Sequence, residues 1–184
     1  DRLKAWVHDG GAVIAIGEAV DLLAQKEVGL TTITHVKGDS AGTKDTTVGD
    51  SQRPGPPIVS PSAAGGTQPE YIPGSIFRAK LDLTHWLTLG YDRDQLPVFL
   101  ETSNLLRPSE RGANAVVFSG TDLLLSGWSW PRNTEKHLQN SVWAAVETVE
   151  KGRVVLFAGN PVYRGFWRGT AKLLTNALLF GPNR

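Results

Sequence analysis

The sequence contains no cysteine and no methionine, and its 184 residues carry 19 basic against 18 acidic side chains. Without cysteine, the chain can form no disulfide, no thiolate nucleophile and no cysteine-bound metal centre. A charge so close to neutral argues against nucleic acid and anionic membranes as partners. No apolar run approaches the roughly 20 residues that cross a bilayer, so no membrane span is expected. Because the chain begins at Asp1 and lacks methionine, we expect a piece of a longer or processed polypeptide.

The clearest pattern lies near the end of the chain. Residues 153–158 are an apolar run rich in β-branched side chains, typical of a strand buried on both faces. A turn is predicted at residues 159–161 and a helix over residues 170–180, with Thr170 as its N-cap and residues 181–182 at its end. Strand, loop and helix in this order predict half of a βαβ unit in an α/β sheet. The inward stripe of the helix is expected to contain Ala171, Leu173, Leu174, Ala177, Leu178 and Phe180.

Further elements are predicted along the rest of the chain. Residues 75–83 alternate polar and apolar side chains, which indicates a half-exposed strand. Lys151 and Gly152 predict a tight hairpin between residues 142–149 and the strand that follows. Short strands are also predicted at residues 12–16, 31–36, 97–101, 115–119 and 123–126, and helices near residues 2–9, 18–26 and 134–139.

One segment has a composition unlike the rest. Residues 38–74 are rich in Gly, Pro, Ser, Thr and Asp and are almost free of apolar side chains in their first half. Such a segment cannot bury enough surface to offset the entropy of ordering it. We therefore expect residues 1–184 to form a single α/β domain, with residues 38–74 as a low-complexity exposed loop within it.

A family resemblance rests on residues 160–179, NPVYRGFWRGTAKLLTNALL. This run resembles the carboxy-terminal end of a group of secreted zinc carboxypeptidases, metallopeptidases related to carboxypeptidase A. In that group a class I glutamine-amidotransferase-like domain follows the peptidase domain. The likeness extends to residues 122–131, 81–91 and 3–17, in the expected order. Trp86 departs from it, because the family has proline after the histidine.

The resemblance implies a fold and a role. The fold would be α/β, a flavodoxin-like three-layer sandwich of the class I amidotransferase-like type that lacks its first βα units in this chain. The role would be that of a non-catalytic accessory domain, secreted or periplasmic, that supports or orients the peptidase domain. Its partner would be that upstream peptidase domain or a chain that completes the sheet. Zinc is expected only in the preceding peptidase domain.

The residues themselves also argue against metal chemistry in this chain. None of the four histidines, His8, His35, His85 and His137, is followed three residues later by glutamate. The His-x-x-Glu ligand pair of a carboxypeptidase is therefore missing. We expect no metal ligand, no cofactor and no catalytic residue in this segment.

A hydrolase triad is the second chemistry that the resemblance raises. It needs a nucleophile on a strand-to-helix turn and a neighbouring histidine. Ser126 follows a predicted strand but lacks the flanking glycine pair, and His137 is the nearest base in sequence. A serine hydrolase stays an alternative, and an ordinary strand-end turn at Ser126 is the favoured interpretation.

Arg164, Trp167 and Arg168 are the candidate ligand-binding residues. They lie between a predicted strand end and the following helix, where open α/β sheets bind ligands. Two guanidiniums beside a helix N-terminus suit a carboxylate or phosphate. The alternative function is therefore an independent module whose Arg/Trp cluster binds an anionic or carbohydrate ligand. The simpler interpretation is that the arginines stack on Tyr163 and Phe166 and hold the last crossover in place.

Six tryptophans are many for this length. Trp128 and Trp130 alternate, so on an extended segment they share one face and could pack against the peptidase domain or bind a carbohydrate or peptide. At least half of the six are expected to fill the core or an interdomain surface.

Overall fold

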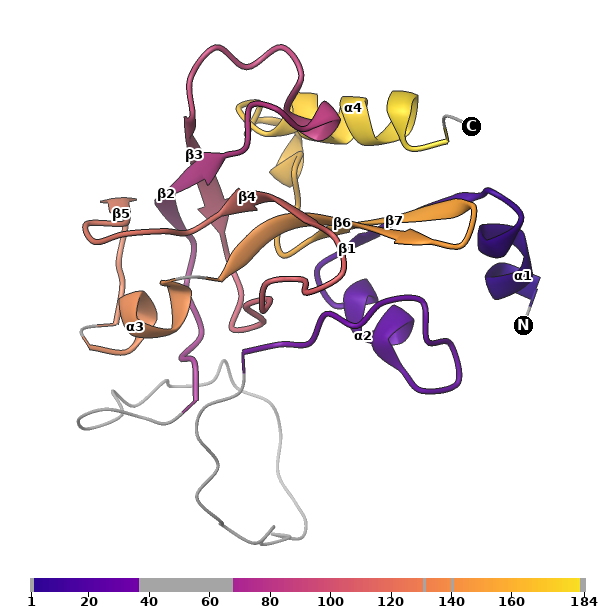
Figure 1. Cartoon of the computed structure of the whole chain (residues 1–184). Helices are drawn as coiled ribbons and strands as arrows, with labels where there is room; N and C mark the ends of the chain where they lie inside the picture. Colours follow the sequence, from indigo (N-terminus) through magenta and orange to yellow (C-terminus); the bar gives the residue numbers. More distant parts are fainter. Residues whose placement is uncertain (1, 37–67, 131, 140, 183–184) are drawn as a thin grey trace, which may run out of the picture.

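The computed structural model describes residues 2–36, 68–130, 132–139 and 141–182. These residues form an α/β protein with a seven-strand mixed, open sheet and few helices (Figure 1). The strand order is β1-β7-β6-β4-β2-β3, and β5 pairs with β2 beside this path. The strands are β1 (Ala12–Ile16), β2 (Ser75–Leu81), β3 (Gln95–Leu100), β4 (Ala113–Val117), β5 (Leu124–Ser126), β6 (Val142–Val149) and β7 (Gly152–Phe157).

Strand direction divides the sheet into two parts. β1 and β7 run parallel, with Ala12 opposite Arg153, whereas the other described pairs are antiparallel. The tight hairpin predicted at Lys151 and Gly152 is confirmed, because β6 and β7 pair antiparallel from Val149 opposite Gly152. The strand predicted to be buried on both faces is confirmed as well, since β7 is buried from Val154 to its end.

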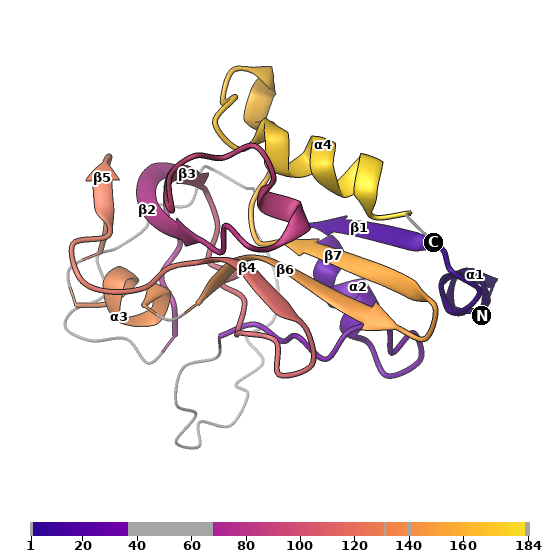
Figure 2. The ribbon, with the colours of Figure 1, turned by 45° about the horizontal axis from the view of Figure 1, so that its top comes forward.

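Helices lie on both faces of the parallel pair. α4 (Ala171–Phe180) and the 3₁₀ helix η1 (Trp86–Thr88) cover one face, and α2 (Ala19–Ala24) lies on the other (Figure 2). The core between these layers contains Trp143, fully buried, with its ring 5.6 Å from that of Phe157 in a T-shaped contact. The remaining helical elements are α1 (Arg2–His8), α3 (Thr134–Leu138) and the 3₁₀ helix η2 (Tyr163–Gly165).

The strand predicted over residues 31–36 is wrong. Within this segment only His35 makes a β-bridge, an isolated one to Leu106. The cause is a competing set of hydrogen bonds: the Thr31 and Thr32 hydroxyls donate to the Glu147 carboxylate at 2.7 and 3.1 Å. These side-chain hydrogen bonds hold the segment against Glu147 of β6, so it passes alongside the sheet without joining its strand ladder.

The inward face of α4 also differs from the predicted stripe. Its buried residues are Leu173, Asn176 and Ala177, whereas Leu178 is 59% exposed. The Asn176 amide donates to the carbonyl oxygens of residues 87 and 89 at 2.8 and 3.0 Å, which turns that flank toward η1. Thr170 is the N-cap residue, as predicted, but its side chain makes no capping hydrogen bond, because its hydroxyl donates to the Pro161 carbonyl at 2.6 Å.

The observed buried face of α4 gives a stability prediction. Leu173→Ala should lower the free energy of unfolding by about 2–3 kcal/mol, because it leaves a cavity beside the sheet. Leu178→Ala, one turn further along, should change it by less than about 0.5 kcal/mol. Urea unfolding of both variants measures the difference. Equal losses would show that Leu178 is packed against protein and that the helix faces another way.

Most of the expected loop over residues 38–74 lies outside the described residues, namely 38–67. Its end is described, and there the chain is anchored. The Glu70 backbone N–H donates to the Asn133 side-chain oxygen at 2.8 Å, and Ile72 is buried. The ordered end of this segment leads directly into β2.

His85 caps η1 and makes stability depend on pH. Its Nδ1 accepts the Leu87 N–H at 3.2 Å, and burial lowers the pKa of the imidazole, with Arg153 adding to this and Asp82 opposing it. The unfolded chain therefore binds the proton more tightly than the folded chain. The contribution of the neutral imidazole is present above about pH 6.5, and it is lost as the pH falls from there through the lower folded pKa.

Chemical unfolding at pH 7.5 and pH 5.5 tests this expectation. The wild-type chain should lose stability between these pH values, and His85→Asn should lose less, because asparagine keeps the capping acceptor without titrating. Identical losses in the two proteins would assign the pH dependence to other groups.

Candidate functional site

The loop between β7 and α4 packs two of its aromatic rings against β3. The ring of Tyr163 lies 4.3 Å from that of Phe99, and the ring of Trp167 lies 6.4 Å from it. The start of the loop lies close to β3 at Gly159, where a Cβ atom would lie only 3.3 Å from the Phe99 carbonyl oxygen. The absence of a side chain at Gly159 allows this close approach. The loop leaves β7, which is next to one edge of the sheet, and packs against β3 at the opposite edge.

The two predicted arginines behave differently. Arg164 has a positive φ of 47° inside η2, and its guanidinium lies 5.2 Å from the centre of the Tyr163 ring. Arg168 is exposed, and its side chain makes no hydrogen bond, ion pair or ring contact with the residues that the structure describes. The geometry thus joins Arg164 and Trp167 through Tyr163 and Phe99, and it leaves Arg168 outside this group.

A carboxylate joins the same group. The Tyr71 hydroxyl donates to Glu101 Oε1 at 3.3 Å, and Tyr163 lies close enough to the same carboxylate for Glu101 to raise the pKa of its phenol. Burial followed by the Glu101 charge raises the pKa of Tyr71. Both phenols therefore hold their protons beside an exposed carboxylate, and the Tyr71 phenol donates to it.

Two tryptophans continue the group beyond Tyr71. Trp130 Nε1 donates to the Tyr71 carbonyl at 2.7 Å, and the rings of Trp130 and Trp128 meet edge to face at 6.1 Å. The two tryptophans thus lie side by side, as predicted, and Trp128 is 54% exposed, so that its ring faces solvent. We call the whole group the aromatic surface: Tyr71, Phe99, Trp128, Trp130, Tyr163, Phe166 and Trp167, with Glu101 and Arg164.

Sequence reasoning missed Tyr71, Phe99 and Glu101. A signal was present in β3, where Val98 and Leu100 are buried while Phe99 lies on the other face. Residues two positions apart lie on the same face of an extended strand, so Phe99 and Glu101 could have been placed together on the outer face. Nothing in the local pattern identified Tyr163 as its partner.

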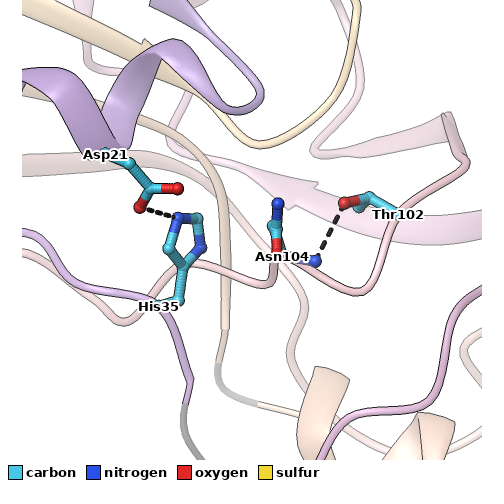
Figure 3. A network of polar contacts seen from close by, with 4 residues as sticks. All are labelled: Asp21, His35, Thr102 and Asn104. Atoms are coloured by element: carbon cyan, nitrogen blue, oxygen red, sulfur yellow. Dashed lines mark hydrogen bonds and ion pairs between the residues drawn. The ribbon is translucent and has the colours of Figure 1, made fainter. Parts of the chain in front are cut away.

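The histidines and serines considered for catalysis do not come together. Ser126 pairs with Ile76 in the sheet, and within the described chain it makes no hydrogen bond to a histidine. His35 instead contacts the Asp21 carboxylate through Nε2, beside the turn in which the Asn104 N–H donates to the Thr102 hydroxyl at 2.8 Å (Figure 3). This His–Asp contact joins α2 to residues 31–36.

A buried carboxylate elsewhere is saturated by its own chain. Glu147 accepts hydrogen bonds from the hydroxyls of Thr31, Thr32 and Ser109 and from the Thr32 N–H, at 2.5 to 3.2 Å. It lines a pocket of about 200 Å³ that Arg111 also borders. Four donors fill the acceptor positions of a carboxylate, so Glu147 joins three segments and has no position left for a ligand.

No family model, no curated protein and no solved structure matches this chain. Among the residues described, no three His, Cys, Asp or Glu side chains lie together so that they could hold a metal ion. The same residues include no helix that is long and apolar enough to cross a membrane. The resemblance stated from residues 160–179 and the accompanying motifs therefore stays a prediction.

Proposed function

We propose that this chain is a non-catalytic accessory domain of a secreted or periplasmic zinc metallocarboxypeptidase, and that it supports or orients a peptidase domain outside this chain. In this proposal the parallel pair β1–β7, with α4 and α2 on opposite faces, is the end of a flavodoxin-like, class I amidotransferase-like sheet. The preceding βα units, the zinc and the catalytic residues belong to the polypeptide that packs against it. The motifs at residues 160–179, 122–131, 81–91 and 3–17 support this family assignment.

The observation that carries the proposal is the open edge of β1. On one side β1 pairs with β7, where Gly17 N–H donates to Phe157 and Gly11 accepts from Arg153. Peptide groups alternate along a strand, so those of residues 12, 14 and 16 point to the other side. Over the part of the chain that the structure describes, no strand pairs there. An apolar parallel strand at a sheet edge is unusual, because parallel strands are normally covered.

The helices next to the parallel pair expose large apolar side chains. Trp6 on α1 is 52% exposed, and Leu22 on α2 and Leu178 on α4 are exposed to a similar degree. Leu178 lies on the flank of α4 away from η1, while the end of α4 approaches β1, since a Cβ atom at Gly181 would lie 3.5 Å from that of Ala12. Together with the open strand, large apolar side chains exposed on three neighbouring helices support a surface that another polypeptide covers.

Hydrogen–deuterium exchange tests this proposal. In the isolated chain, the amides of residues 12, 14 and 16 should exchange rapidly, while those of Val154 and Leu156 in β7 stay protected. In the complete secreted polypeptide that carries a carboxypeptidase domain, the β1 amides should become protected. Slow exchange of the β1 amides in the isolated chain would show that the edge is already covered and would contradict the proposal.

An activity assay separates the accessory role from catalysis. The isolated chain should not hydrolyse hippuryl-L-phenylalanine, with or without added zinc, and should not retain zinc in equilibrium dialysis. The polypeptide with the peptidase domain should hydrolyse it and lose that activity with 1,10-phenanthroline. Leu178→Lys should reduce docking of the two domains. Chelator-sensitive hydrolysis by the isolated chain would overturn the assignment.

A further inference from the structure

We propose that the aromatic surface is a binding site for a neutral oligosaccharide. This inference is independent of the accessory role, because it concerns the β3 edge of the sheet, opposite the β1 edge. No catalytic step is involved. The ligand would lie across exposed rings and hydrogen-bond to Glu101 and Arg164.

The exposed rings supply the apolar half of the recognition. Trp128 and Phe166 are 54% and 63% exposed, and Tyr71 is exposed beside them. Leaving such rings in water forgoes the stabilisation of burying them, whereas Trp143 of the same chain is fully buried. The axial C–H groups of a pyranose present a flat apolar face that packs on an aromatic ring. Exposed rings of this kind therefore suit sugar units as stacking partners.

The polar groups decide the class of ligand. An ionised carboxylate has about four acceptor positions, and the phenol of Tyr71 uses one of those on Glu101. The remaining positions can accept sugar hydroxyls, and Arg164 beside them is a donor. A wholly apolar partner would bury these charges without hydrogen bonds. Glu101 would repel an anionic ligand and Arg164 would repel a cationic one. A neutral polyhydroxylated ligand can hydrogen-bond to both side chains.

The site is also held in place before any ligand arrives. Tyr163 is stacked on Phe99 at 4.3 Å and contacts Arg164 on the ring, and Trp130 is fixed by its hydrogen bond to the Tyr71 carbonyl. Side chains already confined in this way lose little conformational entropy on binding. The corresponding anion site of two arginines is less well formed, because Arg168 takes no part in this group.

Calorimetric titration of the full chain with cellohexaose, chitohexaose, xylohexaose and mannohexaose tests the proposal, with tryptophan fluorescence as a second readout. At least one hexasaccharide should bind with a dissociation constant below about 1 mM. Trp128→Ala and Glu101→Gln should each weaken binding about tenfold or more. Trp128→Phe should retain most of it, because it keeps a ring face. Glu150→Gln, an exposed carboxylate change on the β6–β7 turn, should leave binding unchanged. Circular dichroism confirms that each variant is folded.

Several outcomes overturn the proposal. One is that none of the four saccharides binds at 10 mM. Another is binding that Trp128→Ala and Glu101→Gln leave intact, which places the sugar elsewhere. Titrations with inorganic phosphate and with decaproline complete the test, because binding of either one that depends on Trp128 and Glu101, without saccharide binding, assigns the surface to an anion or a peptide.

Discussion

Glu147→Ala should lower the free energy of unfolding by about 3–5 kcal/mol. Hydrogen bonds to a charged group contribute about 1.5–3 kcal/mol each, and four are lost, although the cost of burying the charge is recovered. Two of the donors have little freedom to find new partners, because the Thr31 hydroxyl accepts from Ile33 N–H and the Ser109 hydroxyl accepts from the N–H groups of Arg111 and Gly112. Urea unfolding monitored by circular dichroism measures the loss.

Two further variants sharpen this prediction. Glu147→Gln should lie between Glu147→Ala and wild type, because its carbonyl keeps one pair of bonds while its amide meets hydroxyls oriented as donors. Glu150→Ala is the matched control on the adjacent turn and should change stability by less than about 0.5 kcal/mol. A glutamine variant as stable as wild type would show that the carboxylate is not the acceptor that holds residues 31–32 and Ser109 together.

Gly152→Ala should cost about 3 kcal/mol or more, enough to reduce the yield of folded protein. Gly152 is buried at the start of β7, and a Cβ atom there would overlap the carbonyl oxygens of Val7 and Gly11. Overpacking of side chains typically costs about 1–3 kcal/mol, and these obstacles are backbone atoms that move only if α1 or the start of β1 moves. The glycine is required by close packing, since its φ is not positive.

Gly169→Ala is the control for this substitution. Its nearest neighbour would be the Pro97 carbonyl oxygen at 3.8 Å, an ordinary contact, so stability should stay within about 1 kcal/mol of wild type. Thermal unfolding and tryptophan emission compare the two variants, because a displaced α1 changes the surroundings of Trp6. Normal stability of Gly152→Ala would show that α1 does not pack on the start of β7.

The aromatic surface shows where sequence patterns stop being informative. Arg164 and Trp167 could be selected from the sequence, because a loop between a strand and a helix is a common place for ligand contacts. Tyr71 and Glu101 could not, since each lies more than sixty residues from Tyr163 in the chain. They come together because the loop that follows β7 packs its rings on Phe99 of β3, although β3 lies at the other end of the strand order from β7.

Helix faces show a similar division. The apolar repeat correctly predicted a helix ending near Phe180, and Leu173 and Ala177 are buried as expected. The repeat was nearly as strong on the side of Leu178, which is exposed. The hydrogen bonds from Asn176 to η1 select the face, and a polar residue inside an apolar stripe gives no sign of such a partner.

The sequence by itself determined the α/β class, the β6–β7 hairpin, the buried strand β7 and the exclusion of cysteine chemistry. These properties depend on the type of each residue and on neighbours within a few positions, which periodicity records directly. Only the tertiary structure decided that β1 lies at an open edge, that Glu147 bonds to two distant segments, and that Glu101 lies among aromatic rings. Those properties depend on which distant segments become neighbours, and that choice is made by packing the whole chain at once.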